Sequence, residues 1–358
     1  MTNITRRENI QKIIGSRFNP KNVNTGLWLD KFIYDSQEKG KSEAAILQDA
    51  DKKEETAKTA LVNQVVQIQT PEIYKKFFNK TWLPNLHDHG AICKKATVKN
   101  RLAINLGSES VLETNIALHR IFGVPFIPGS ALKGLVAHFL QNYGGDDWNE
   151  TSQNYITIFG NQEKAGFITF HDALLFVPKD GNSKHSLCAD VMTTHHPDYY
   201  APNNRTIPPA DWDNPNPVPF ISATGDFLIA VSGPNHWVEL TFQILKFALQ
   251  DEGIGAKTSS GYGRMYFSGD ILSDEQIEAA QADQFSEIFN KLEILVNADR
   301  DTRKTTNKEI KVFLKGIEDA EKKKEVAGKL YKKAKELEIA ERLEETNTQW
   351  FKWVIDEK

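Results

Sequence analysis

The chain has 358 residues, of which 40% are hydrophobic and 26% charged, and its formal net charge is −4. This is the composition of an ordinary globular protein with room for one large domain or two. It excludes a global positive field, so any nucleic-acid binding would need a local basic patch. The only cysteines, Cys93 and Cys188, form no disulfide framework, and no apolar run could span a bilayer. We therefore expect a cytoplasmic protein without a membrane partner.

The elements expected in the first half of the chain begin with a variable N-terminal region, residues 1–95, in which a short helix at 70–83 opens at Pro71. The β-rich stretch 97–105 predicts a strand, and a long irregular segment follows it. Apolar residues at helical spacing predict a helix over 131–143, capped by Ser130 and ended by two glycines.

The second half predicts strands at 166–177, 220–232 and 264–268, with a helix at 237–249 before the last strand. Residues 178–219 hold eight of the fourteen prolines and form a long insertion between the second and third strands. The order β-α-β-β-α-β predicts an α+β fold of the ferredoxin-like, or RRM-like, kind, with an antiparallel sheet and helices on one face. This domain would cover residues 96–270.

Residues 271–358 predict a helical C-terminal extension, in which Lys and Glu alternate along solvated helices. It ends in an aromatic and apolar cluster at 350–355. Two interpretations of that cluster are open. It packs on its own domain, or it forms a helix that binds a partner.

The most informative segment is a glycine-rich loop with four glycines, two cations and a tyrosine, Gly253-Ile-Gly255-Ala-Lys257-Thr258-Ser-Ser-Gly261-Tyr262-Gly263-Arg264. Glycines let backbone N–H groups approach an anion closely, and such loops form anion-binding concavities. We expect Lys257 to bind phosphate, Arg264 to bind phosphate or a base, the four glycines to supply backbone donors, and Tyr262 to stack on RNA or to pack in the core. The spacing does not fit a P-loop or a dinucleotide fingerprint.

A second motif precedes and opens the first long helix, Gly123-Val-Pro-Phe-Ile-Pro-Gly-Ser130-Ala-Leu-Lys133-Gly134. With the glycine-rich loop it resembles the RAMP superfamily of CRISPR-associated proteins. Two further segments, 190–200 and 208–220, narrow the resemblance to the family of the sixth RAMP subunit of the type III-B (Cmr) effector complex. The resemblance covers about residues 95–268.

This resemblance implies a non-catalytic backbone subunit that binds the 3′ part of the guide RNA beside other Cmr effector subunits. The helix start, with Ser130 and Lys133, and the loop residue Thr258 would contact RNA together with the residues above. The 178–219 insertion would be a β-hairpin thumb between guide RNA and target RNA. Sequence specificity would come from base pairing, while the protein recognises the shape and backbone of the RNA.

Catalysis is not expected. The resemblance places the aspartate of a target-cleaving relative in the loop 105–129, which here holds Glu109 and Glu113 but no aspartate. His119, beside Arg120, is the one candidate for a general acid or base, which would make the chain a metal-independent endoribonuclease that processes precursor guide RNA. The alternative is that His119 and Arg120 contact the guide or pack in the loop. A third possibility is an assembly factor that binds only protein through its C-terminal helices.

We expect no cofactor and no metal. Two groups of residues are possible zinc ligands, His87, Asp88, His89 and Cys93 in one and Cys188, Asp190, His195 and His196 in the other. Neither group has the paired ligand spacing of a structural zinc site.

Overall fold

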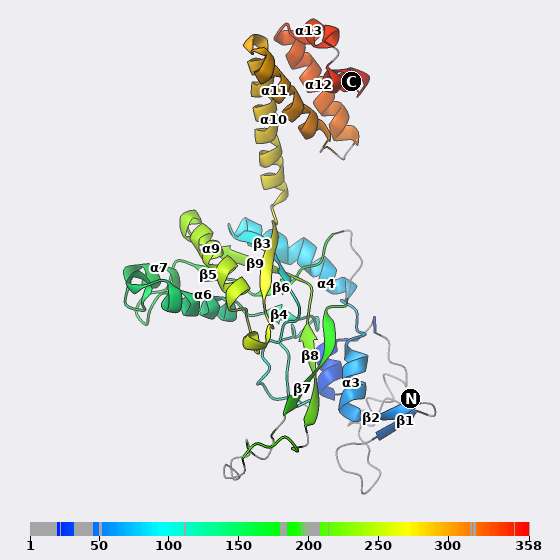
Figure 1. Ribbon diagram of the computed structural model, residues 1–358, viewed down its shortest axis with the longest axis vertical. Coiled ribbons are helices and arrows are strands. Elements are labelled where there is room, and N and C mark those ends of the chain that lie inside the picture. The colour runs from blue at the N-terminus through cyan, green and yellow to red at the C-terminus, as the bar shows by residue number, and fades with distance from the viewer. Residues whose placement is uncertain are drawn as a thin grey trace. The chain divides into compact units, whose positions relative to one another are not determined.

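The structure is a computed structural model, and it describes residues 20–21, 23–31, 46–49, 52–110, 112–179, 185–194, 196, 199, 208–213, 215–315, 317, 320–346 and 348–357. The chain divides into two compact units, Met1–Ile271 and Leu272–Lys358, each described here by itself (Figure 1). No helix in the part of the chain that the structure describes is long and apolar enough to cross a membrane.

Unit 1 combines helices with three antiparallel sheets, which makes it an α+β fold. Its helices are α2 (Thr25–Lys31), α3 (Ala57–Val65), α4 (Glu72–Phe77), η1 (Phe78–Trp82), α5 (Leu83–Asp88), α6 (Gly129–Tyr143), η2 (Asp146–Trp148), α7 (Gln153–Phe159), α9 (Asn235–Asp251) and η3 (Thr258–Ser260). Its strands are β1 (Ile46–Asp49), β2 (Lys52–Thr56), β3 (Ile92–Val98), β4 (Phe126–Ile127), β5 (Thr169–Phe170), β6 (Ala173–Leu175), β7 (Leu187–Thr194), β8 (Asn216–Ala223), β9 (Asp226–Ser232) and β10 (Met265–Asp270).

The central sheet has the order β10-β3-β9-β6-β4, with β5 also paired to β9. Each of these neighbouring strand pairs is antiparallel. Helix α6 lies in the chain between β3 and β6, and α9 lies between β9 and β10. The two helices pack against each other, so the two motifs that flank them meet at one end of the sheet (Figure 1).

Helices cover both faces of this sheet, whereas the sequence predicted helices on one face only. Adjacent strand residues point to opposite faces. Lys94 lies over the Phe242 ring of α9, while Lys95 lies over Phe176, and the Phe176 ring packs edge-on against Phe78 of η1. Figure 1 shows α6 and α9 on one side of the strands and α4 on the other. The segment α3–α5 therefore belongs to the same core as the sheet.

The reason for the second helical layer is visible in β9, whose five central residues, 227–231, are all fully buried. A strand with one solvated face alternates apolar and polar residues, whereas a strand covered on both faces reads as a continuous apolar run. The buried hydroxyl of Tyr74 in α4 donates to the Leu175 carbonyl of β6 at 2.5 Å, which fixes the second layer on the sheet.

The observed strands differ in their bounds from the predicted ones. The first strand is β3, which ends at Val98, so most of the predicted strand 97–105 lies beyond it. The predicted strand 220–232 is two strands, β8 and β9, because Gly225 turns the chain with φ +109°. Helices α6 and α9 fall within two residues of the predicted bounds at each end.

The insertion predicted at 178–219 contains a long antiparallel ribbon. Strands β7 and β8 pair antiparallel over eight residue pairs, from Leu187 opposite Ala223 to Thr194 opposite Asn216. The ribbon joins the rest of unit 1 at Ala223, which exchanges two backbone hydrogen bonds with Leu102, both 2.8 Å. His195 and part of the segment between the two strands lie outside the described residues.

Unit 2 is helical and has its own apolar core. Its helices are α10 (Asp274–Asn297), α11 (Arg300–Lys315), α12 (Ala320–Glu336), α13 (Ala340–Glu345) and α14 (Gln349–Glu357). Trp350, Phe351 and Val354 of the aromatic end are buried in that core, and the Trp350 indole donates to the Asn307 side chain at 2.8 Å. The aromatic end therefore packs within the helical extension itself.

Candidate nucleic-acid interface

A groove of about 620 Å³ separates the face of α6 from the glycine-rich loop. One wall consists of Ala131, Leu135 and His138, which follow one another on a single face of α6. The other wall is residues 251–255 with Thr258, Ser259 and Arg264. The structure thus brings the second motif and the glycine-rich loop to one site.

Two glycines of the loop are required by protein contacts. A Cβ at Gly263, which has φ +71°, would lie 1.9 Å from the Ile254 carbonyl oxygen. A Cβ at Gly255, which has φ +92°, would lie 2.3 Å from the Ala103 carbonyl oxygen. Real side chains do not tolerate such contacts, so glycine is needed here for the loop to close on itself.

Most of the expected glycine donors are not available to a ligand. The N–H groups of Gly253, Gly261 and Gly263 donate to the carbonyls of Ala248, Thr258 and Arg101 at 2.9, 3.0 and 2.8 Å. This corrects their predicted role, because a donor already paired within the fold has nothing to offer an anion.

Four other N–H groups remain available. Those of Gly255, Lys257, Thr258 and Ser259 have no acceptor among the residues that the structure describes. Lys257 has φ +58°, in the left-handed region, and the short η3 turn starts directly after it. Consecutive open N–H groups next to a left-handed residue are the arrangement that holds an anion.

The loop and the segment bonded to it carry four cations, and two of them come from a segment that the sequence did not single out. Lys257 is exposed, and the Arg264 guanidinium donates to the Gln250 carbonyl at 3.2 Å. Lys99 and Arg101 are both exposed, and their backbones bond to Arg264 and Gly263 of the loop at 2.8 Å. The short basic stretch after β3 was the available signal.

The opposite end of the groove is acidic. Asp251 and Glu252 line it, and the Glu252 carboxylate lies 3.9 Å from the His138 imidazole. Carboxylates repel phosphate, so a phosphodiester would sit at the Lys257 end, beside the open N–H groups. Arg264, the arginine in the groove lining, also lies at this end, where it bonds to Gln250.

The helix start does not offer the anion site that was predicted. Helix α6 begins at Gly129, with Pro128 at its N-cap, so Ser130 lies inside the first turn and caps nothing. The Gly129 N–H donates to the Asp172 carboxylate at 2.7 Å. An internal anion thus already occupies the positive end of the helix dipole.

Lys133 does not line the groove. Its ammonium donates to the Phe159 carbonyl at 2.8 Å. Two residues along a helix lie about 200° apart, which places Lys133 on the face opposite the groove residue Ala131. Lys133 and the glycine-rich loop therefore do not form one site, contrary to the prediction.

Tyr262 connects the loop to the ribbon. Its hydroxyl donates to the Asp190 carboxylate of β7 at 2.6 Å, and its ring lies 6.1 Å from that of Phe220 in β8. Burial, reinforced by the Asp190 carboxylate, raises the pKa of Tyr262 to about 12. Of the two predicted roles for Tyr262, this geometry favours packing.

His119 lies in an aromatic cluster. Its ring is 4.9 Å from Phe122 and 6.4 Å from both Phe77 and Phe126. Burial lowers the pKa of His119, against a smaller opposing effect from Asp172. Arg120 is exposed next to it. Neither residue lines the groove.

The residues considered for a metal have other partners. Burial raises the pKa of the Cys93 thiol to about 12, and the His87 and His89 rings bond to the Ile271 and Asn85 carbonyls. His196 lies 2.8 Å from Asp213. Among the described parts of the chain, no three His, Cys, Asp or Glu residues lie close enough together to hold a metal.

Comparisons with known proteins show to which superfamily and family the chain belongs. Residues 95–266 match the RAMP superfamily. The Cmr6 subunit of the CRISPR Cmr system from Pyrococcus furiosus is 32% identical over 249 residues, which cover 54% of this chain and 73% of the relative. Its counterpart from Saccharolobus solfataricus is 24% identical over 146 residues, or 38% of this chain and 45% of that one.

Two solved structures are also similar. The crystal structure of Cmr6 from Pyrococcus furiosus has 31% identity and a TM-score of 0.33, and the match covers 50% of this chain and 98% of that one. A cryo-EM structure of type III-B Cmr-beta bound to cognate target RNA contains a chain with 18% identity and a TM-score of 0.46, with 74% and 96% covered.

The protein is therefore a member of the RAMP superfamily. Within that superfamily, the identity to the Pyrococcus subunit over most of its length shows that the chain belongs to the Cmr6 family of type III-B CRISPR subunits.

Proposed function

We propose that this chain is a non-catalytic, RNA-binding backbone subunit of a type III-B CRISPR effector ribonucleoprotein in the cytoplasm. It binds the 3′ part of the guide RNA, assembles with other Cmr subunits, and helps to present the guide to target RNA in antiviral defence. The Pyrococcus relative is named as a Cmr subunit, and the similar cryo-EM complex contains target RNA. The strand order and the position of the helices support a ferredoxin-like core for this role.

The observation that carries the proposal is the row of open N–H groups at 257–259. They lie beside the exposed Lys257, and the exposed Lys99 and Arg101 belong to a segment whose backbone bonds to the same loop. Such a site fits a phosphate and has no group that would select a base. A guide of any sequence would therefore bind.

The β7–β8 ribbon supports the second part of the proposal, a thumb between guide and target. It lies between the second and third strands of the core sheet, at the predicted place. Near its far end Trp212 is 85% exposed, and Val191 within the ribbon is 57% exposed. An exposed indole offers a face on which a displaced base can stack. The Tyr262–Asp190 hydrogen bond would hold this ribbon to the phosphate site.

The proposal that the chain is non-catalytic depends on the surroundings of the two side chains that could have catalysed RNA cleavage. Glu113, in the loop where a relative's aspartate would lie, forms an ion pair with Lys58. His119 packs against aromatic rings, and burial lowers its pKa more than the Asp172 carboxylate raises it. Replacement of His119 by Ala in a cleavage assay on precursor RNA checks this, and a large drop in a measurable rate would overturn it.

The phosphate site is tested with the double variant Lys257→Ala, Arg101→Ala in the full chain. Labelled single-stranded RNA is titrated at several salt concentrations, with anisotropy as the signal. Each lost phosphate contact lowers the log–log salt slope by roughly 0.7 for single strands, so two contacts lower it by about 1.4. We expect weaker binding with no change in sequence preference, because backbone contacts carry none.

A matched control removes two exposed lysines outside the glycine-rich loop and the segment bonded to it, Lys80→Ala with Lys164→Ala. It changes the net charge equally and should leave the slope near that of the wild type. An unchanged slope in the Lys257–Arg101 variant, or an equal fall in the control, would refute the phosphate site.

A further inference from the structure

Helix α11 of unit 2 carries a row of cations on one exposed face. The row, which we call the α11 stripe, consists of Arg300, Lys304, Lys308, Lys311 and Lys315. Their spacings of four, four, three and four residues place them within an arc of roughly 80°, along about 22 Å of helix. The buried residues Thr306, Ile310 and Leu314 lie on another face, whose centre is about 120° round the helix from that of the stripe. The stripe is therefore the solvent side of a helix whose other side packs in the core.

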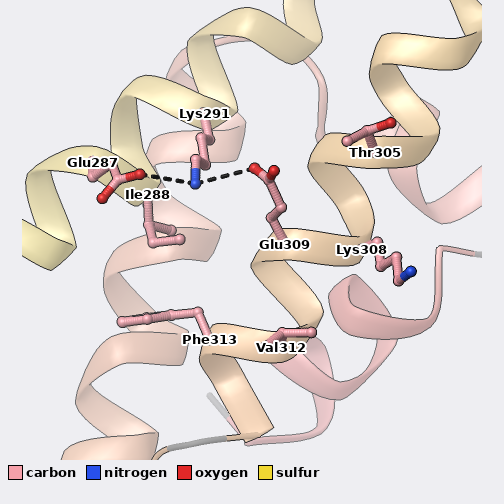
Figure 2. Close-up of a pocket in the computed structure, with 8 residues that line it drawn as sticks. All are labelled: Glu287, Ile288, Lys291, Thr305, Lys308, Glu309, Val312 and Phe313. Atoms are coloured by element: carbon pink, nitrogen blue, oxygen red, sulfur yellow. Dashed lines mark ion pairs between the residues drawn. The ribbon is translucent and has the colours of Figure 1, made fainter.

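Two of the acidic groups near the stripe pair with a lysine outside it. Lys291 of α10 takes up both Glu287, at 2.9 Å, and Glu309 of α11, at 3.0 Å. Figure 2 shows the Glu309 side chain turned toward Lys291, while Lys308 extends away from it. Across the described part of unit 2, no carboxylate lies within 4.0 Å of a stripe cation. Lys311 instead bonds to the neutral side chain of Gln349.

Helix α12 is also rich in lysine, but some of its lysines form ion pairs with carboxylates. Lys329 pairs with Glu325 at 2.6 Å, and Lys333 pairs with Glu293 at 3.0 Å. The lysines of α12 thus stabilise the bundle in part, whereas the stripe adds unneutralised positive charge in a chain whose net charge is −4. Like charges in successive turns of a helix repel one another, which destabilises the unliganded helix.

We propose that the α11 stripe binds the phosphodiester backbone of single-stranded RNA as a second contact surface, separate from the groove of unit 1. A regular row of point charges complements a regular row of phosphates. Lysine recognises phosphate as a point charge without fixed geometry, so the contact would be independent of sequence. Val312, 64% exposed, is the large apolar side chain of α11 that lies exposed beside the stripe, whereas a folded protein partner would bury several apolar contacts as well as charges. The choice of RNA rests on the proposed function.

The test uses the full chain with Lys304→Gln, Lys308→Gln and Lys315→Gln combined. Glutamine keeps length and helix propensity but removes charge. With labelled oligouridylate, three lost contacts should lower the log–log salt slope by about 2, at roughly 0.7 each. The matching Lys→Arg triple variant should keep both affinity and slope. Far-ultraviolet circular dichroism should be unchanged in both, because the three side chains are exposed.

A charge-matched control replaces Lys324, Lys332 and Lys352, which are exposed on α12 and α14, by Gln. An unchanged slope in the stripe variant, or an equal fall in the control, overturns the proposal. If the stripe variant keeps RNA binding but loses polyglutamate binding, the surface belongs to an acidic protein, and the proposal is likewise overturned. The groove is scored separately by the Lys257–Arg101 variant, so a failure of one site is distinguishable from a failure of the other.

Discussion

Replacement of Gly263 by Ala should open the glycine-rich loop. Two costs add up. An L-residue at φ +71° costs about 1–2 kcal/mol. The new Cβ would also lie 1.9 Å from the Ile254 carbonyl oxygen, so the backbone must separate there. That separation removes the Ile254–Gly263 and Gly263–Arg101 backbone hydrogen bonds, of 2.9 and 2.8 Å. At about 0.5–1.5 kcal/mol each, the total destabilisation is about 2–5 kcal/mol.

The same loop provides the control. Gly261 also has a positive φ, +86°, but a Cβ there would meet nothing within 4 Å. Gly261→Ala should therefore show only the conformational part, about 1–2 kcal/mol. Hydrogen exchange of the Ile254 and Gly263 amides in the full chain measures the local opening free energy without requiring the two units to unfold together.

The difference in amide exchange rate between Gly263→Ala and Gly261→Ala tests whether steric closure holds the loop. Exchange at Ile254 should be faster in Gly263→Ala than in Gly261→Ala by on the order of tenfold to a hundredfold, since each 1.4 kcal/mol is a factor of ten. Equal exchange rates in the two variants would show that steric closure does not hold the loop, and the account of Gly263 would be wrong.

Three further predictions concern the same unit. Asp172→Ala should destabilise α6 by about 1 kcal/mol in thermal unfolding, because the Gly129 N–H loses its acceptor. Tyr262→Phe should cost about 1.5–3 kcal/mol through the lost bond to Asp190. The raised pKa of Tyr262 makes that contribution complete below pH 10 and lost as the pH rises toward about 12, which a pH series of unfolding curves would show. Lys257→Gly should weaken RNA binding but stabilise the fold by up to about 1 kcal/mol. Glycine relieves the left-handed strain in the folded state, and this gain exceeds the loss that comes from the greater entropy of glycine in the unfolded chain.

The sequence predicted helices better than strands for a physical reason. Helices α6 and α9 each carry an apolar stripe over several turns, and this periodicity fixes their existence and their ends. Strand β3 contains two adjacent lysines, Lys94 and Lys95, whose stems pack on aromatic rings from both faces. Its pattern therefore resembles neither a half-buried nor a fully buried strand, and its start was missed. Gly225, in contrast, was a readable turn signal within the predicted strand 220–232.

The site shows where prediction from sequence ends. The glycines correctly mark positions where backbones come close together, but a sequence cannot tell whether the approaching group belongs to a ligand or to the protein. At Gly263 and Gly255 it is a carbonyl of the same chain. The same limit applies to Lys133, whose ammonium finds an internal carbonyl rather than the groove. Partners that are distant in sequence decide which donors remain open.

Lys257 is then the most telling residue of the loop. The glycines there are explained by closure of the loop alone, but a lysine at φ +58° is not, since glycine would adopt this conformation at lower cost. Its side chain is exposed, and the N–H groups of residues 257–259 beside it are open among the described residues. A strained residue that contributes nothing to packing is best explained by a ligand that its charge binds. If Lys257→Gly stabilises the fold and weakens RNA binding, the lysine serves a ligand. If the variant lowers both stability and RNA binding, the role of the lysine is structural.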